Sequence, residues 1–592
     1  MKRIYYVLFV VIITFISIEC RKEFSGENAF PGQGSIQSSP IRATLQGNIV
    51  DENDQPAEGV VVSVGTKAAT TNSHGYFRIV DASLDKNASL VTAEQPGYFK
   101  AYRTFSATSG VNQVVIKLIK KALTGTISAA TGGSVALVNG SKVSLNANGV
   151  VDANGIAYTG NVNVYVAYIN PVSNDIGKKI PGSFMADDKN NKRVVLSSYG
   201  MLAVNLESSA GEKLQVASNS TATLTVPIPT SISSSAPASI GLWYIDEQTG
   251  IWKEQGMAQK NGSNYVGSVK HFSYWNCDSP LPAISFSATF VTSANIPLAN
   301  TYVVIKPNTS DSANGYAHGY TDSLGQISGL IPANVNLTMA IYDQCGSMVF
   351  SKDIGPFSVN TDLGAIIISN SANYITTIKG KLLSCGNTPV THGYATIYFN
   401  NFVYNVNVND MGEFVTNIMS CYGTPGDFQI LGVDETAQQQ GTLATFTVSS
   451  QVVDAGNIMA CGTSSAQYIN YNVDGVDHII SNNANDSFYC YTSAGVNLFN
   501  TYDSYITGYH APDNISLYFS GDKVAGVYPV NFMSVLNYTW TGLAKPFNIT
   551  LTSFPQVIGD YYEGNFSGSF VDSTALTITH NINCSFRIRK NN

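Results

Sequence analysis

Cysteine is the residue type through which this chain could form covalent links at several places. Thiols that meet in an oxidising compartment pair as disulfides, whereas those of a cytosolic protein stay reduced. For an exported chain, the spacing predicts one bridge between Cys490 and Cys584 and at least one more within a central group. The count after Cys20 is odd, so at least one thiol stays free or pairs between chains, and we expect Cys277 to be that residue. The central group comprises Cys345, Cys385, Cys421 and Cys461.

Histidine and acidic residues show no pattern typical of a metal or cofactor site. The seven histidines are never closer than 32 residues apart, which excludes a local His-x-x-His or HExxH motif. Asp51, Glu52 and Asp54 form an acidic turn without the spacing of an EF-hand, and we expect a solvated hairpin tip there. GxSxG, phosphate-loop and dinucleotide motifs are absent. The sequence therefore predicts no metal, no cofactor and no enzyme of these kinds, although carboxylates that meet only through tertiary contacts stay open.

Tyrosine is concentrated in the last part of the chain. Twelve of the 33 tyrosines lie within residues 463–592, a segment that resembles no family. One interpretation is that they fill strands and cores. The other is an aromatic platform for a sugar or a protein, because tyrosine offers a large rigid ring with a polar tip. Such a platform is expected in loops 500–513 and 555–563, with the candidate residues Tyr502, Tyr505, Tyr509, Tyr561 and Tyr562.

The elements that carry these residues are expected to be strands. Strict alternation of apolar and polar residues, typical of half-buried strands, recurs along the chain and is clearest over residues 576–589. No helical stripe longer than two turns follows residue 20. We therefore predict an all-β protein of tandem β-sandwich domains, transthyretin-like or Ig-like, with no substantial helix after the N-terminal segment.

The fraction of charged residues is low, and the basic residues form no cluster in the sequence. Only 72 of the 592 residues are charged, and the net charge is -8. Average soluble domains carry about 25% charged residues, many of them on exposed helix faces. A nucleic-acid partner would need a clustered basic surface. The composition thus argues against helix-rich folds and against nucleic-acid binding.

The N-terminus has the pattern of an export signal. Lys2 and Arg3 precede an apolar run from Ile4 to Ile18, which is too short to span a bilayer comfortably, and Glu19 and Cys20 follow it. A signal peptide of residues 1–20 ending on cysteine, followed by charged residues, resembles the surface lipoproteins of Bacteroidetes-type bacteria, although Glu19 stands where a small residue is usual. The resemblance implies lipid attachment at Cys20, with the membrane as partner and an outer-membrane, surface-exposed location. Residues 21–41 are rich in Gly, Ser, Pro and Gln and predict a flexible tether.

A repeat becomes visible when three segments are aligned. Each reads as strand, proline turn, strand, and then an Asx-containing turn with glycine at its fourth position. The glycines are Gly75, Gly325 and Gly412. The segments resemble the carboxypeptidase regulatory-like domain, a small transthyretin-like β-sandwich that is a non-catalytic companion in metallocarboxypeptidases. The resemblance covers 42–120 and 371–462, and more weakly 279–370.

The central segment, residues 121–278, follows another pattern. Its strands, and the hairpin bearing Trp243 and Trp252, resemble the β domain of cartilage intermediate layer protein, and more distantly the paired β domains of ankyrins and netrin receptors. It ends in His271-Phe272-Ser273, the sequence at which some death-domain adaptors of the netrin-receptor type cleave themselves. That resemblance implies Ser273 as nucleophile, the Phe272 carbonyl as its target and His271 as base. The alternative is a last strand that packs Phe272 and Trp275 inward.

These observations together predict a non-catalytic, lipid-anchored cell-surface protein. Its domains are expected to form a rod that presents residues 463–592, serving adhesion, glycan capture or envelope scaffolding, with a glycan or a surface protein as partner. The alternative is a surface protein that autoproteolyses at Phe272-Ser273, and a third hypothesis places an enzyme within residues 463–592.

Overall fold

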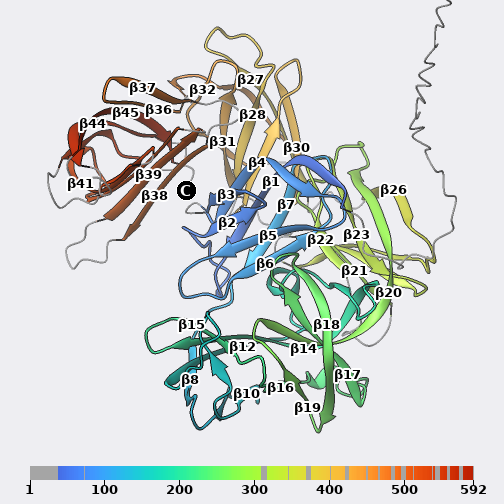
Figure 1. Ribbon diagram of the computed structural model, residues 1–592. Coiled ribbons are helices and arrows are strands. Elements are labelled where there is room, and N and C mark those ends of the chain that lie inside the picture. Colours follow the sequence, from blue (N-terminus) through green and yellow to red (C-terminus); the bar gives the residue numbers. More distant parts are fainter. Residues whose placement is uncertain are drawn as a thin grey trace, which may run out of the picture.

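The computed structural model consists almost entirely of strands, which confirms the predicted all-β fold of sandwich domains (Figure 1). Within the described residues, helix is limited to the four-residue α1 (Ile176–Lys179) and the 3-10 turn η1 (Thr230–Ile232). The structure describes residues 38–71, 74–308, 317–343, 346–368, 375–399, 402–419, 426–448, 451–464, 467–481, 487–494, 502–510, 513–536, 538–540, 547–555, 561–571 and 578–590.

The first domain is a sandwich of two sheets. One sheet has the order β4-β1-β7 and the other β3-β2-β5-β6. Leu45, Val62 and Val91 are buried between them, as the alternation of their strands requires. Its strands are β1 (Pro40–Val50), β2 (Val61–Val64), β3 (Lys67–Thr70), β4 (Tyr76–Asp85), β5 (Ser89–Glu94), β6 (Ala101–Phe105) and β7 (Asn112–Lys117).

The third domain repeats this arrangement. The second half of β20 is antiparallel to β23 and parallel to β26, just as β1 is antiparallel to β4 and parallel to β7. The second sheet has the order β22-β21-β24-β25. The strands are β20 (Tyr274–Thr292), β21 (Tyr302–Pro307), β22 (Ala317–Tyr320), β23 (Gln326–Pro332), β24 (Leu337–Tyr342), β25 (Met348–Ile354) and β26 (Thr361–Ile368).

The fourth domain is another copy. Here β27 is antiparallel to β30 and parallel to β34, and the second sheet has the order β29-β28-β31-β32-β35, with β33 also paired to β31. The strands are β27 (Ile375–Leu383), β28 (Gly393–Phe399), β29 (Phe402–Asn407), β30 (Glu413–Met419), β31 (Asp427–Asp434), β32 (Gln439–Gln440), β33 (Ala444–Thr447), β34 (Val452–Met459) and β35 (Thr463–Ser464).

The turn glycines explain why the repeat is legible in the sequence. Gly75, Gly325 and Gly412 have φ angles of 65°, 73° and 77°, a region that side chains disfavour. Each glycine carbonyl accepts a hydrogen bond from the first strand of its own domain, at 2.7, 2.8 and 2.7 Å respectively. The proline turns are equivalent as well, with the bridges Val50–Pro56, Val291–Pro297 and Leu383–Pro389. The repeat predicted from the sequence is therefore a repeat of structure.

The central domain is a larger β unit. Trp243, Trp252 and Trp275 are fully buried in its cores. The first half of β20 pairs with β14 and β17, so the expected boundary at residue 278 falls inside a continuous strand. Its other strands are β8 (Leu123–Ser128), β9 (Gly133–Ala136), β10 (Lys142–Leu145), β11 (Val150–Val151), β12 (Asn161–Ile169), β13 (Met185–Asp187), β14 (Arg193–Ser208), β15 (Lys213–Val216), β16 (Ala222–Pro227), β17 (Ser239–Asp246), β18 (Ile251–Asn261) and β19 (Asn264–Val269).

The C-terminal domain is a ten-stranded sheet whose buried side chains form one core. In β45 the alternation predicted for residues 576–589 is present, with Ile582, Cys584, Phe586 and Ile588 inside. The strands are β36 (Tyr468–Val473), β37 (Val476–Ser481), β38 (Ser487–Ala494), β39 (Tyr502–His510), β40 (Asp513–Gly521), β41 (Gly526–Val535), β42 (Tyr538–Trp540), β43 (Asn548–Ser553), β44 (Tyr561–Val571) and β45 (Thr579–Arg589).

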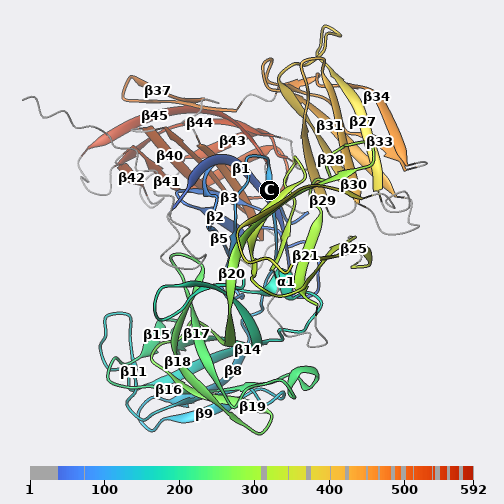
Figure 2. The same cartoon turned by 90° about the vertical axis from the view of Figure 1, so that its right-hand side faces the viewer.

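The five domains do not follow one another as a rod. The first domain lies between the others, with the central domain below it and the fourth and C-terminal domains above (Figure 1; Figure 2). It contacts each of the other four domains, for example through Tyr102 against Tyr274 and through Tyr76 against Asn405. The expectation of a rod is wrong because buried polar and aromatic contacts tie the first domain to distant parts of the chain. Among the described residues, no helix is long and apolar enough to cross a membrane.

Candidate functional site

The outer face of β39 and β40 carries exposed tyrosines. Ser504, Ile506 and Gly508 of β39 point into the domain, so Tyr505 and Tyr509 lie on the opposite face, 40% and 49% exposed. Tyr505 is directly opposite Tyr518 of β40, and the two rings stack with centroids 4.7 Å apart. We call this surface, made of Tyr505, Tyr509 and Tyr518, the tyrosine face.

A row of hydrogen-bonding side chains continues the tyrosine face along the same two strands. Ser520 is the neighbour of Asp503 across the strands, and its hydroxyl donates to the Asp503 carboxylate at 2.8 Å. The Asn531 amide of β41 donates to the Ser520 hydroxyl, also at 2.8 Å. The stacked rings are thus bordered by a carboxylate, a hydroxyl and an amide, which combine donors and acceptors.

The other three candidate tyrosines are placed differently. Tyr502 is half-buried, and the Lys523 ammonium lies 4.0 Å from the centre of its ring. Tyr561 and Tyr562 are only 4% and 1% exposed, so neither ring is available to a ligand, which corrects the expectation for these two residues. Tyr562 lies in the domain core, where burial raises its pKa to about 12, and the Arg587 guanidinium lies 3.9 Å from the Tyr561 ring centre.

The His271-Phe272-Ser273 segment is held as ordinary packed structure. The Ser273 hydroxyl donates to the Tyr274 carbonyl at 3.1 Å, and the Phe272 carbonyl accepts from the Gln215 amide at 2.8 Å. The His271 ring packs edge-on against Tyr244 with centroids 4.7 Å apart, and burial lowers its pKa.

The segment therefore lacks the arrangement that self-cleavage requires. In this described part of the chain no hydrogen bond joins His271 to Ser273, and no residue of the triplet has a positive φ. A cleaving serine needs its base within hydrogen-bond reach and a strained peptide to attack. The structure agrees instead with the alternative, in which Phe272 and Trp275 are buried.

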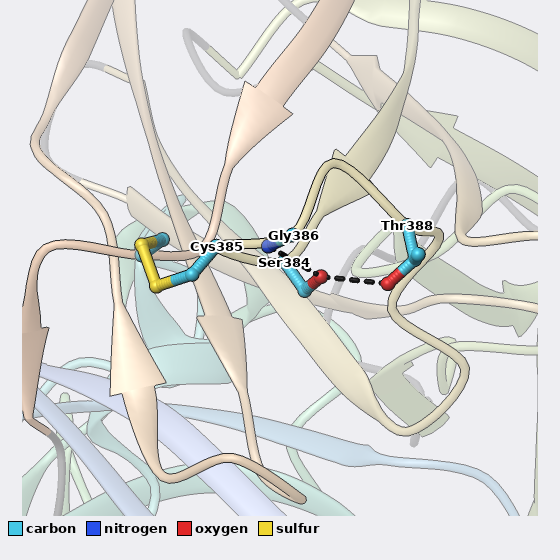
Figure 3. Close-up of a disulfide and its surroundings, with 5 residues drawn as sticks. Ser384, Cys385, Gly386 and Thr388 are labelled. Carbon is cyan, nitrogen blue, oxygen red and sulfur yellow. Dashed lines mark hydrogen bonds between the residues drawn. A yellow bond between two sulfur atoms is a disulfide. The ribbon is translucent and has the colours of Figure 1, made fainter.

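Cys385 and Cys461 of the fourth domain form a disulfide (Figure 3). This agrees with the prediction of a bridge within the central group. Cys345, Cys421 and the lipid-attachment candidate Cys20 lie outside the described residues. Cys277 is a buried free thiol, as expected.

The predicted bridge between Cys490 and Cys584 is wrong in this structure. Both residues are buried thiols, and the Cys490 thiol donates to the carbonyl of Arg589 at 3.3 Å. Cys584 lies five residues before Arg589 on the same strand, about 16 Å away at the rise of a β-strand. Disulfides need Cα atoms within about 7 Å of each other. The register of β45 thus keeps the two thiols apart.

The acidic turn at residues 51–54 forms ion pairs with lysines. Asp54 contacts the buried Lys117 ammonium at 2.6 Å, and Glu52 contacts Lys120 at 2.8 Å. Hydrogen bonds from Lys120 and Tyr98 lower the pKa of Glu52 to about 2. Among the described residues, no group of three or more His, Cys, Asp or Glu side chains could hold a metal ion. The turn, which follows β1, is therefore joined by ion pairs to the end of β7 and to the segment after it.

Sequence reasoning missed the residues that complete the tyrosine face. Tyr505 and Tyr509 share a face because they are four positions apart on a strand, which the pattern alone could show. Tyr518 and the row of Asp503, Ser520 and Asn531 depend on the pairing of β39 with β40, where His510 is opposite Asp513. Pro512 was the available sequence signal for a break between the two strands.

Comparison with known proteins gives no family assignment. No protein-family model matches the chain, and no curated protein matches it. Similar solved structures include a Streptococcal ancillary pilin, at 8% identity and a TM-score of 0.13 over 39% of this chain and 94% of that one. The shaft pilin of Lactobacillus rhamnosus GG is 10% identical with a TM-score of 0.17, over 31% of this chain and 98% of that one. The major pilin subunit of Bacillus cereus is 10% identical with a TM-score of 0.12, over 71% of this chain and 99% of that one. At these identities and TM-scores, the similarities give no argument about the function of this chain.

Proposed function

We propose that this protein is a non-catalytic binding scaffold of the bacterial cell surface that captures a glycan on its tyrosine face. The observation that carries the proposal is the stacked pair of Tyr505 and Tyr518, which lies beside the hydrogen-bonded row of Asp503, Ser520 and Asn531.

The chemistry of this surface matches that of a sugar ring. A pyranose has apolar C–H faces, which pack on flat aromatic rings, and a rim of hydroxyls, which both donate and accept hydrogen bonds. Tyrosine combines a rigid apolar body with a polar tip, and the neighbouring carboxylate and amide offer acceptors and donors. Because strand pairing fixes Tyr505 and Tyr518, little conformational entropy is lost on binding.

The architecture supports a scaffold. The first domain is tied to the C-terminal domain by the hydrogen bond from Thr70 to Tyr489, at 3.0 Å. It is tied to the third domain by two hydrogen bonds, one from the Val111 N–H to the Ser323 hydroxyl at 2.9 Å and one from the Ser323 N–H to the Val111 carbonyl at 3.1 Å. Contacts of this kind favour one body over five freely jointed units. Such a body can hold a binding surface at a fixed place relative to the tether.

The anchor is proposed from the sequence. The export signal ends at Cys20 and is followed by a tether, so lipidation there would fix the first domain close to an outer membrane. Metabolic labelling with a fatty-acid probe tests this step. Label on the wild-type chain that is lost in Cys20→Ala supports the anchor, and an unlabelled wild-type chain contradicts it.

A glycan array tests the binding function. The purified wild-type chain is compared with a double variant, Tyr505→Ala with Tyr509→Ala, and with Val527→Ala, which removes another exposed apolar side chain of the same domain. We expect a defined set of glycans to bind the wild-type chain and Val527→Ala but not the double variant. Equal binding by all three chains, or no glycan binding by the wild-type chain, would contradict glycan capture. In the second case, a surface protein would be the remaining partner class.

A further inference from the structure

A cavity lies where the first, central and third domains meet. Its volume is about 110 Å³. Strands β6 and β7 contribute from the first domain, α1 and the segment before β13 from the central domain, and β21 to β23 from the third. Most of the lining is apolar, including Phe184, Val195, Phe286, Val303, Ile327 and Leu330.

Of the described residues that line this cavity, one is charged, Arg103 on β6. Arg103 is only 6% exposed. Its Nη1 donates to Nε2 of His318 on β22 at 3.2 Å, while Nε and Nη2 have no hydrogen-bond partner among the residues that the structure describes. A backbone group of Gly177 in α1 also hydrogen-bonds the His318 ring. The guanidinium is therefore held by neighbouring domains and keeps two donors for another molecule.

Arg103 has no counter-charge within the described part of the chain. No carboxylate of the described residues pairs with it, and the oxygens close enough to act on it are the phenols of Tyr302 and Tyr320. Burial lowers the pKa of Arg103 to about 10, so the group is still a cation at neutral pH. Burial and the Arg103 charge lower the pKa of His318 to about 3. The ring is therefore neutral, and its Nε2 can accept a hydrogen bond from Arg103.

A buried and uncompensated guanidinium is costly. Buried charges are normally paired, because removing an ion from water costs several kcal/mol. Water in the cavity could satisfy the free N–H groups, but it cannot neutralise the charge. An anion that reaches Nε and Nη2 would do both, and a carboxylate matches the planar donor geometry of arginine.

We propose that this cavity binds a small monocarboxylate. Its carboxylate pairs with Arg103, and its apolar body packs against the side chains of Phe184, Phe286 and Leu330. The volume fits roughly four to eight non-hydrogen atoms, since a cavity of about 150 Å³ holds benzene. Branched acids such as isobutyrate and isovalerate have this size and this division into a charged head and an apolar body.

Binding of such an acid would join three domains at once. The carboxylate lies against the first domain and the apolar body lies against the central and third domains, so the ligand stabilises their docking. A ligand that binds only the docked form raises the thermal stability of that form. This proposal is independent of the tyrosine face, which lies in the C-terminal domain.

Calorimetric titration and thermal unfolding of the full mature chain test the proposal, in chloride-free buffer at neutral pH. The probes are isobutyrate and isovalerate, their uncharged amides isobutyramide and isovaleramide, and chloride. We expect saturable binding of the acids with a rise in unfolding temperature, and at least about tenfold weaker binding of the amides, because a hydrogen bond to a charged group contributes about 1.5–3 kcal/mol. Equal binding of acid and amide, no binding of either acid, or chloride binding as tight as that of the acids would overturn the assignment.

Two variants locate the site. Arg103→Met removes the charge at similar size, and Arg42→Met does the same for an arginine whose side chain is 64% exposed in the first domain. We expect Arg103→Met to lose acid binding by at least about tenfold and to unfold at the same or a higher temperature than the wild-type chain without ligand, because an uncompensated buried charge is gone. Arg42→Met should bind as the wild-type chain does. Unchanged acid binding in Arg103→Met would overturn the proposal, and if that variant does not fold, the comparison of acid with amide on the wild-type chain decides.

Discussion

The hydroxyl of Thr70 in the first domain donates a hydrogen bond to the phenol oxygen of Tyr489 in the C-terminal domain, across 419 positions of sequence. Thr70 is only 2% exposed. Such a contact requires the chain to return to its beginning after passing through three other domains. The first domain is accordingly the centre of the molecule. The tyrosine face lies on β39, which pairs with the strand that carries Tyr489, and on β40, the strand after it.

Small-angle scattering of the purified chain distinguishes this arrangement from a linear one. A compact body of this length has a radius of gyration of about 25–30 Å, and a rod of five domains has one of roughly 50 Å. We expect the lower range. A value above about 40 Å, with the profile of an elongated particle, would show that the domains separate in solution.

The repeat predicts where alanine is tolerated. Alanine at Gly75 or Gly325 would place Cβ 2.2 or 2.4 Å from the carbonyl oxygens of Ile49 and Phe290, in addition to the strain of a positive φ. We expect each substitution to lower the free energy of unfolding of its domain by about 3 kcal/mol. The control is Gly65→Ala, which has φ +56° but nothing within 4 Å, and should cost only about 1 kcal/mol. Scanning calorimetry measures the difference, and equal effects at all three positions would contradict the account of the turn.

The disulfide of the fourth domain should be a main source of that domain's stability. It joins residues 76 positions apart, and closing a loop of this length stabilises by about 4 kcal/mol in the chain-entropy description. We expect Cys385→Ser with Cys461→Ser to lower the unfolding temperature of this domain. In a non-reducing digest, the peptides of Cys385 and Cys461 should be linked, while Cys490 and Cys584 should resist alkylation until the chain unfolds. A linked Cys490–Cys584 peptide would contradict the register of β45.

The cysteines and tyrosines show what the sequence could and could not predict. The repeat was readable because the turn glycines and prolines are local requirements of the backbone. Whether Cys490 reaches Cys584 depends on strand register across the sheet, and the burial of Tyr561 depends on which strands become neighbours. The burial of Arg103 could not be predicted from the sequence, because it depends on two other domains that cover this strand.

The chain should not cleave itself at Phe272-Ser273. The Ser273 hydroxyl donates to a carbonyl on its own C-terminal side, and His271 is occupied by aromatic packing. On a denaturing gel we expect one full-length band for the wild-type chain, identical to that of Ser273→Ala. Two fragments from the wild-type chain, absent in Ser273→Ala, would require a rearrangement of this strand.

The most direct test of the central claim is the affinity of the tyrosine face for a glycan that the array identifies. Calorimetric titration compares the wild-type chain with Tyr505→Ala, with Tyr505→Phe, which keeps the ring, and with Val527→Ala. Because a buried aromatic contact contributes about 2 kcal/mol or more when it is central to an interface, Tyr505→Ala should weaken binding by roughly thirtyfold. Tyr505→Phe and Val527→Ala should stay within a few-fold of the wild-type affinity. If Tyr505→Ala binds the glycan as tightly as the wild-type chain, the tyrosine face is not the binding site.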